Sequence, residues 1–379
     1  MKTNGQIGLG KFCISNRAED QEAEFIDGIG AVFMLASDGD ILVEGASGRE
    51  LRVKVGISSV SVENALQNLE FSLPGWDYEA TRKAASDAWE EELSRIRVKS
   101  PDRNQLIVFY TALYHTMIAP SLFSDMNGEF KGVKGDVQKA ESYRRYTVFS
   151  LWDTYRALHP LLTFTQQPLV NDIVMSMLDH YKQTGLLPVW ELQGNETFCM
   201  VGNHAIPVIS EAILKGIGDF DTQLAYEAMK ATSMFDRDGI GFYDSLGFMP
   251  ADKVSQSVAK SEEVAVDDWC LAAVARKLGK NDDAEYFGNR SHNYKSYFDA
   301  ETGFMRGRLS DGNWTTPFDP AFSRHEGSDY TEGNAWQYLW LVPHDIEGLI
   351  DLLGGKQKFA DKLDSLFKVE EGVKGEEAS

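Results

Sequence analysis

The chain has 379 residues, of which 43% are hydrophobic and 25% charged, a composition typical of a globular protein. Its 37 Lys and Arg residues stand against 58 Asp and Glu residues, which gives a net charge of −21. This balance argues against nucleic acid and anionic membranes as partners, because both bind basic surfaces. The three cysteines, Cys13, Cys199 and Cys270, are isolated and provide neither a disulfide framework nor a zinc-binding pattern.

The first 75 residues have the pattern of short β-strands. Three runs, GIGAVFMLA, DILVEGA and LRVKVGISSVSV, are rich in β-branched residues and are separated by Asp-Gly, Gly and Ser signals. They are too few for an independent sandwich or barrel, so we expect residues 1–75 to be the C-terminal strands of an N-terminal β-domain. The alternative is a small sheet packed on the next domain. The first residues lack an apolar core, so we expect no signal peptide within this sequence.

A charged amphipathic segment follows, and we expect a linker helix over residues 76–100. Beyond it the helical period dominates, with Gly and Pro in most gaps. The apolar run 106–123 is interrupted by Tyr114, His115 and Pro120, so it predicts a buried helix and no membrane insertion. The candidate helices are 102–118, 150–163, 169–184, 203–217, 221–234, 257–278, 281–298, 331–342, 345–353 and 356–366.

These helices differ in length and are joined by long aromatic-rich connections. No short motif repeats at a fixed period, which argues against a regular solenoid. The pattern indicates a mainly α protein with an α/α toroid-like helical domain. In such a ring, the connections at one end form a cleft.

Tryptophan occurs beside acids or amides in five of the expected connections and helix ends. A sugar ring needs aromatic rings against its C–H faces and carboxylates or amides for its hydroxyls, so the pairing favours a carbohydrate site. The alternative is that each Trp belongs to the core and each acid is a cap or a surface charge. The groups are Trp152–Asp153, Trp190–Glu191 with Asn195–Glu196, Asp267–Asp268–Trp269, Trp314, and Glu332 with Asn334 and Trp336.

Glu332, in DYTEGNAW, has two interpretations. It is the third residue of a capping box if Asp329 caps the following helix. The Gly and Asn that follow Glu332 are poor residues for a first helical turn, and glycine permits close approach of a ligand. Nearby aromatic side chains favour the protonated form of a carboxyl, which makes Glu332 a candidate general acid. The two roles do not exclude each other.

Three other features have open interpretations. Asp267 and Asp268 either repel or bind a cation, or they form an exposed pair at a helix start. His204 is either a satisfied core histidine or a partner of a sugar hydroxyl. The segment 124–130, SDMNGEF, lacks the full calcium-loop pattern and predicts a turn. No pattern for nucleotide or acyl-transfer chemistry is present.

Seven motifs in chain order make the sequence similar to glycoside hydrolase family 92, the exo-acting α-mannosidases. The resemblance is dense from about residue 50 onward. The motifs are FYTALYHTMIAPSLFSD, YTVFSLWDTYRALHPLLT, LPVWELQGNET, DDWC, TGFMRGR, DYTEGNAWQYLWLVPHD and LDSLF.

The resemblance implies a β-sandwich joined to an (α/α)6 catalytic domain, dependence on calcium, and removal of terminal α-linked mannose from glycans with inversion. In the family pattern the Glu of TEGNAW is the general acid, here Glu332, and the SLWDT pair, here Trp152 and Asp153, lines the mannose site. Members are mostly exported, to the periplasm, the cell surface or the medium. The resemblance and the pairing above together give the remaining expected substrate-binding residues: Trp190, Glu191, Asn195, Glu196, His204, Asp267 and Asp268.

The sequence also departs from the family pattern. The segment that supplies the catalytic base and part of the calcium ligands, and the early β-sandwich, are not among its residues. We therefore expect an internal fragment of a longer enzyme, with residues 101–379 as a catalytic domain truncated at its C-terminus and inactive alone. Val264 and Val266 replace two aromatics usual before DDW, which predicts a looser cleft wall. The competing hypothesis is a non-catalytic carbohydrate-binding α/α toroid.

Overall fold

The computed structural model describes residues 13–15, 25–26, 30–34, 40–42, 52–324, 327–368, 372 and 374–375. Its contacts divide the chain into two compact units, Met1–Thr147 and Val148–Ser379. Within the described ranges, no helix combines the length and the apolar character that crossing a lipid bilayer requires.

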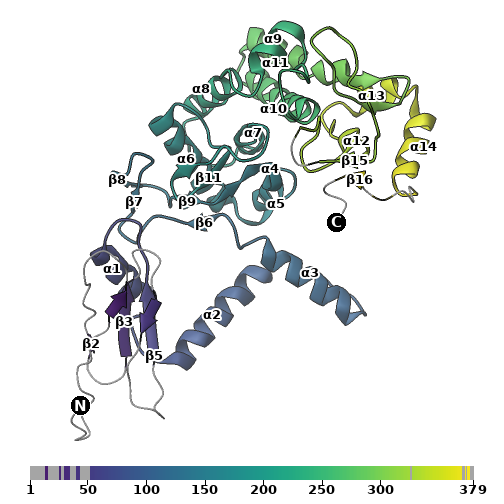
Figure 1. Cartoon of the computed structure of the whole chain (residues 1–379). Coiled ribbons are helices and arrows are strands. Elements are labelled where there is room, and N and C mark those ends of the chain that lie inside the picture. The colour runs from purple at the N-terminus through teal and green to yellow at the C-terminus, as the bar shows by residue number, and fades with distance from the viewer. Residues whose placement is uncertain are drawn as a thin grey trace, which may run out of the picture. The chain divides into compact units, whose positions relative to one another are not determined.

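The first unit begins with two small sheets (Figure 1). In one, β1 (Cys13–Ser15) pairs antiparallel with β4 (Asp40–Leu42). In the other, β3 (Gly30–Met34) lies between β2 (Phe25–Ile26), to which it is antiparallel, and β5 (Arg52–Gly56), to which it is parallel. Each of the three predicted β-branched runs therefore contains a strand.

A helix that the sequence analysis missed, α1 (Val62–Ser72), follows these strands. Its N-cap is Ser61, whose side chain accepts a hydrogen bond from the backbone N of Asn64 at 3.1 Å. This cap lies inside a β-branched run, and the β-propensity of that run concealed the helix start. The other elements of the unit are α2 (Tyr78–Leu93), α3 (Arg103–His115), β6 (Ser121–Leu122), β7 (Glu129–Lys131), β8 (Val137–Lys139) and β9 (Tyr146–Thr147).

Residues 124–130 form the predicted turn, between β6 and β7. The backbone N of Gly128 donates to Asp125 O at 2.9 Å, and Asp125 N donates to Glu129 O at 2.8 Å. The Asp125 carboxylate accepts hydrogen bonds from the side-chain amides of Asn64 and Asn68 at 2.8 and 2.7 Å. Its oxygens thus fasten the turn to α1 instead of forming an open cation site.

Helices dominate the second unit and pack in successive pairs, α5 with α6, α7 with α8, α10 with α11 and α13 with α14 (Figure 1). This is the arrangement predicted for an α/α toroid, and the mainly helical fold is confirmed. The helices are α4 (Leu151–Thr154), α5 (Leu158–Thr165), α6 (Gln167–Thr184), α7 (Ala205–Lys215), α8 (Thr222–Ser233), α9 (Ile240–Leu246), α10 (Ser257–Lys277), α11 (Asn281–Arg290), the 3-10 helix η1 (Asn293–Tyr297), α12 (Ala335–Tyr338), α13 (Ile346–Leu352) and α14 (Lys356–Leu366).

Several predicted helices have other boundaries in the structure: α3 ends at His115, residues 281–298 are divided into α11 and η1, and only the four residues of α12 are helical within 331–342. The predicted helix 150–163 is divided into α4 and α5, because Ala157 between them has an extended φ of −143°. Helix α9 was not predicted, since its seven residues are too few to show a helical period; left-handed Gly239 and Gly247 bound it.

Short strands connect the helices. The sheet nearest to the predicted site has the order β10 (Phe149–Ser150), β11 (Trp190–Leu192) and β12 (Asn195–Glu196), all antiparallel, with Ser150 opposite Trp190. The others are β13 (Phe298–Asp299), β14 (Phe304–Met305), β15 (Phe322–Ser323) and β16 (Lys374–Gly375).

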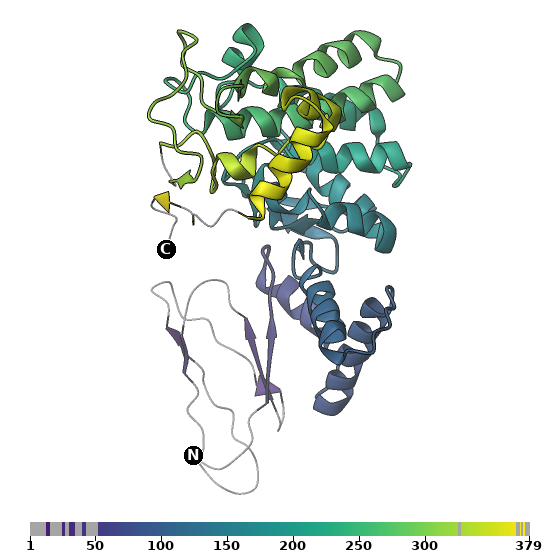
Figure 2. The same ribbon diagram turned by 90° about the vertical axis from the view of Figure 1, so that its right-hand side faces the viewer.

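Helix α10 is enclosed by its neighbours. It packs against α7, α8, α11 and η1 and lies among the other helices of the unit (Figures 1 and 2). Fifteen of its 21 residues are buried. Four of those buried residues are carboxylic acids. Burying a charge costs several kcal/mol unless partners compensate it, so each of these acids needs an explanation. They are Glu262, Glu263, Asp267 and Asp268.

Candidate active site

Two acids of α10 converge on one imidazole. Glu263 and Asp267 are one helical turn apart, so they project from the same face of the helix. His204, which precedes α7, places Nδ1 2.8 Å from Asp267 Oδ1 and Nε2 3.1 Å from Glu263 Oε2. The backbone N of Asn203 also donates to Asp267 Oδ2 at 2.7 Å. All three side chains are buried, so His204 is clamped between two carboxylates.

The charges in this cluster follow from its burial and its pairing. Burial alone would lower the pKa of His204, but the carboxylates of Asp267 and Glu263 outweigh it and raise this pKa to about 9. Burial alone would raise the pKa of Glu263, but His204 and Arg156 hold it below its usual value. At neutral pH the cluster therefore contains an imidazolium and an ionised Glu263.

Glu263 also accepts hydrogen bonds from three side chains of the segment 152–156. Its Oε1 accepts hydrogen bonds from Trp152 Nε1 at 2.7 Å and Arg156 Nη2 at 2.6 Å. Its Oε2 accepts from the Tyr155 hydroxyl at 2.9 Å. The Tyr155 ring stacks on His204, with centroids 4.0 Å apart and planes 16° from parallel. The buried carboxylate thus supports an aromatic wall.

The guanidinium of Arg156 lies over this wall, 5.6 Å from the Trp152 ring centroid and 4.7 Å from that of Tyr155. Unlike Glu263, the Arg156 side chain is 38% exposed. Asp153, which precedes these residues on α4, is exposed and accepts a hydrogen bond from Ser150 Oγ. The wall therefore presents both a cation and a carboxylate to solvent.

Glu332 is not the helix cap. Helix α12 is capped by Asn334, whose side chain accepts from Trp336 N at 3.1 Å, while the Gln337 side chain accepts from Asn334 N at 3.0 Å. The predicted box of Asp329 and Glu332 is therefore wrong, because the chain is still irregular there and the helix starts later.

Asp329 instead ties this irregular segment to its neighbours, because its carboxylate accepts from Thr315 Oγ1 at 2.9 Å and from Ser257 Oγ at 3.3 Å. Glu332 itself is exposed and has a φ of +45°, a left-handed conformation that is uncommon for a residue other than glycine. Residues held in this way are often found at functional sites.

Tyr338 connects the Glu332 loop with the Glu263 cluster. Its hydroxyl donates to the backbone O of Thr331 at 2.7 Å, directly before Glu332. Burial raises the pKa of Tyr338, and the charge of Glu263 raises it further. Tyr338 also packs in one hydrophobic cluster with Ala259 and Ala265 of α10. The segment that carries Glu332 therefore lies beside the helix that carries Glu263.

The β11–β12 hairpin lies beside α4, because β11 pairs with β10. Trp190 is half-buried there and Asn195 is exposed at the turn. Glu191 is buried and accepts from Gly194 N at 2.6 Å. Glu196 accepts from three backbone N–H groups, those of Val189, Trp190 and Phe198, at 2.7, 3.0 and 2.6 Å. The two acids shape the hairpin, and the Trp and Asn remain available to a ligand.

Asp268 points away from this cluster. Arg290 donates to both of its oxygens at 2.7 Å, and Ser233 Oγ donates at 2.9 Å. Arg290 also reaches Asp244 at 2.7 Å. Asp267 and Asp268 are both buried in the middle of α10, so the prediction of an exposed pair at a helix start is wrong. The two acids point about 100° apart on the helix and have separate partners, His204 for Asp267 and Arg290 for Asp268.

Sequence reasoning missed Glu263, Tyr155 and Arg156. The available signal was the spacing of Glu263 and Asp267, which places both on one helical face. In the sequence, Asp267 is paired more conspicuously with its neighbour Asp268 than with Glu263.

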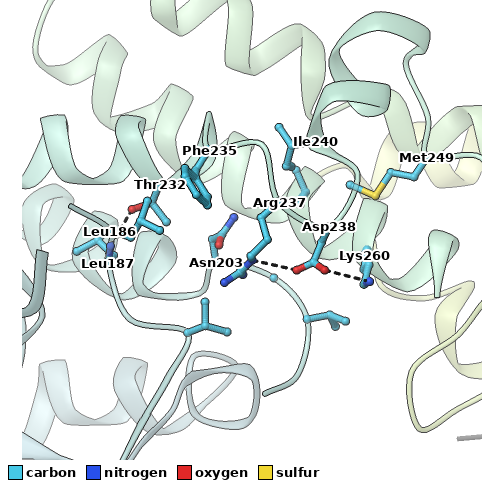
Figure 3. Close-up of a pocket in the computed structure, with 14 residues that line it drawn as sticks. Leu186, Leu187, Asn203, Thr232, Phe235, Arg237, Asp238, Ile240, Met249 and Lys260 are labelled. Carbon is cyan, nitrogen blue, oxygen red and sulfur yellow. Dashed lines mark hydrogen bonds and ion pairs between the residues drawn. The ribbon is translucent and has the colours of Figure 1, made fainter. Parts of the chain in front are cut away.

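A small pocket lies beside the cluster, next to Asn203 and Val264 (Figure 3). Only about 20 Å³ of it is accessible to water, too little for a sugar ring. Asp238 pairs with Arg237 at 2.9 Å and with Lys260 at 3.4 Å, as the dashed lines in Figure 3 show. Val264 thus lines a narrow gap, whereas a wider hollow of about 610 Å³ lies next to it and shares Asp238 and Lys260.

Residues 64–378 match the model of the glycosyl hydrolase family 92 catalytic domain. A curated relative from Arthroderma benhamiae, named an uncharacterized secreted glycosidase, is 28% identical over 398 residues, covering 93% of this chain and 47% of the relative. The chain belongs to glycoside hydrolase family 92, and it spans about half the length of this relative.

Solved structures of family 92 members have the same fold as this chain. The family GH92 α-mannosidase BT3965 from Bacteroides thetaiotaomicron is 44% identical, with a TM-score of 0.78, over 83% of this chain and 42% of that one. It has also been solved in complex with mannoimidazole. The inverting mannosidase BT2199 from the same organism is 28% identical, with a TM-score of 0.79, over 94% of this chain and 49% of that one.

Proposed function

We propose that the chain is part of an α-mannosidase that removes terminal α-linked mannose from glycans. The observation that carries the proposal is that Trp152 and His204 meet on Glu263 of α10, while the segment with Glu332 packs beside the same helix, in a chain of this family. Aromatic and charged groups gathered at helix ends are what a sugar site requires. The secreted relative supports an exported enzyme.

Glu332 is the general acid of this proposal. An alkoxide leaving group needs a proton from a carboxylic acid. Because Asn334 and Gln337 cap α12, Glu332 has no part in that box. Its exposure and left-handed backbone are consistent with a side chain directed by function.

The proposed mechanism is inverting, as in the relative BT2199. Inversion requires a second carboxylate roughly 6.5–9.5 Å from the acid, with a water between them. Asp267 and Asp268 are poor bases, since both are buried and engaged by His204 and Arg290. We assign no base among the described residues.

Sugar contacts in this proposal come from the exposed side of the cluster. Trp152 and Trp190 stack on the sugar, and Asp153 and Asn195 accept or donate hydrogen bonds to its hydroxyls. Both ring nitrogens of His204 face carboxylates, so His204, like Asp267, acts through Glu263. The remaining predicted residues, Glu191, Glu196 and Asp268, support the hairpin and the core.

Calcium remains a prediction of the family resemblance. Among the described residues, no group of three or more His, Cys, Asp or Glu side chains is arranged to hold a metal ion. The acids nearest to the proposed site are committed to His204, Arg156 and Arg290. These donors do not fit a complete calcium site, and no step is derived through the ion.

An assay on an aryl α-mannoside, with calcium and with a chelator, tests the function. It is run on this chain and on a version extended beyond Ser379. Calcium-stimulated release of the aryl group by either version supports the proposal. Binding of mannoimidazole without turnover by both would favour a non-catalytic carbohydrate-binding toroid.

A further inference from the structure

Glu263 is the buried carboxylate on which four side chains of the cluster converge. It is fully buried, yet its two oxygens bind four side chains from two segments, Trp152, Tyr155 and Arg156 on one side and His204 on the other. Its charge is balanced by Arg156 and the imidazolium of His204. A buried carboxylate with two cationic partners is costly to assemble, and its hydrogen bonds are correspondingly directional.

Arg156 shows what this arrangement achieves. Its Nη2 is held by Glu263 at 2.6 Å and its Nε donates to Trp152 O at 3.1 Å. Arginine carries five N–H donors in a rigid fork. Among the described residues, Nη1 makes no hydrogen bond, and the side chain is 38% exposed. One edge of the guanidinium is thus fixed and the other edge faces outward.

Trp152 is fixed in the same way. Its Nε1 donates to the oxygen of Glu263 that also binds Arg156. This bond sets the rotation of the indole, while part of the side chain remains accessible. One carboxylate oxygen therefore sets the orientation of both an aromatic face and a row of donors.

We propose that Glu263 is the positioning residue of the sugar site, and that it aligns Trp152 to stack on the sugar and Arg156 to donate to its hydroxyls. This inference rests on the proposed function and adds two residues to it. Asp267 holds the imidazole of His204, and His204 in turn holds the carboxylate of Glu263 in place. Glu263 does not touch the sugar, whereas Arg156 does.

The test compares Glu263→Gln with Glu262→Gln in mannoimidazole binding by calorimetry. The second variant is a matched control, because Glu262 is the next residue, equally buried, and bonded to none of the cluster residues. Glu263→Gln keeps the size and removes the charge, so we expect affinity to fall about 10- to 150-fold. Glu262→Gln should bind as the wild type does.

Arg156→Lys supplies a second route, since lysine keeps the positive charge that balances Glu263 and the Arg156 side chain is 38% exposed. If Glu263 acts through Arg156, the loss in the double variant is smaller than the product of the two single losses. In a version of the protein that turns over, both single variants should have a higher KM and a nearly unchanged kcat. The reason is that these contacts bind the ground state and the transition state equally.

A readout independent of sugar completes the test. In ¹⁵N NMR, the pKa of His204 should fall in Glu263→Gln, where only Asp267 still faces the ring, and stay unchanged in Glu262→Gln. If the wild type binds mannoimidazole and Glu263→Gln binds it equally well, or if the two single losses multiply, the positioning role is overturned. If the wild type neither binds nor hydrolyses mannosides in the extended version, the proposed function fails, and the sugar role of Glu263 fails with it.

Discussion

Glu262 and Glu263 are neighbours on α10 and both are fully buried, yet their carboxylates meet opposite surroundings. Glu263 binds four side chains, whereas neither oxygen of Glu262 has a hydrogen-bond partner within the described part of the chain. Burial, followed by the charge of Glu263, raises the pKa of Glu262 well above its usual value. Glu262 is therefore a neutral acid in the core, beside an ionised one.

This difference predicts a pH dependence of stability. The raised pKa means that the folded state holds the Glu262 proton more tightly than the unfolded state, so the contribution of Glu262 to stability is greatest below its unfolded pKa of 4.5. It falls as the pH rises from there toward the folded pKa. Glu262→Leu removes the titration and the unpaired group, and should add about 1–3 kcal/mol to the free energy of unfolding at pH 8.

Urea denaturation at pH 4.5 and pH 8 measures this effect. The control is Glu285→Gln on the exposed side of α11, which should change stability by less than about 0.5 kcal/mol. Equal stability of Glu262→Leu and wild type at pH 8 would show that Glu262 finds a partner in solution.

Glu332→Gln tests the general acid. In a version of the protein that turns over, kcat on mannosides with poor leaving groups should fall about 10²- to 10⁴-fold, because the alkoxide then leaves without a proton. Activated aryl mannosides should lose much less. Equal losses on both substrates would make Glu332 a binding residue.

Stability separates this role from capping. Asn334→Ala removes the cap of α12 and should lower the free energy of unfolding by about 0.5–2 kcal/mol. Glu332→Gln should leave it nearly unchanged, since Glu332 takes no part in the box. Chemical denaturation of both variants checks the contrast.

Asp153→Ala tests the sugar contacts. The carboxylate is exposed beside Trp152, so its loss should weaken mannoimidazole binding by about 10- to 150-fold, the effect of removing a charged hydrogen-bond acceptor. The fold should survive, because the only partner of Asp153 among the described residues is Ser150. Calorimetry measures the affinity and circular dichroism the fold; an unchanged affinity would remove Asp153 from the site.

Asp268→Asn tests the core network. Arg290 is buried and would lose its bidentate partner, which costs about 3–5 kcal/mol when one member of a buried ion pair is removed. We expect a much lower thermal midpoint and, in the folded fraction, normal mannoimidazole binding. Weaker mannoimidazole binding with an unchanged thermal midpoint would indicate that Asp268 contacts the sugar.

The sequence predicted the helical pairs and the strands because both follow from periodicity along the chain. It could not predict the partners of α10. Consecutive residues on a helix point about 100° apart, so Asp267 and Asp268 face different neighbours although they are adjacent in sequence. Beyond its spacing from Asp267, no pattern in the sequence singles out Glu263, because its role follows only from the packing of α4 and the start of α7 against α10. The cap of α12 was misplaced because Asp-x-x-Glu and Asn-x-x-Gln both occur within the short segment 329–337.

The hydrogen bond between Trp152 and Glu263 joins residues 111 positions apart, and the Tyr338–Thr331 bond adds a third segment farther along the chain. Closing loops of this length is slow compared with forming local helices, so the site assembles after the helices that carry it. A nascent chain that has emerged only as far as α7 holds His204 without either of its carboxylates. Because both carboxylates that face His204 come from α10, its imidazolium gains its buried counter-charges only when this helix docks.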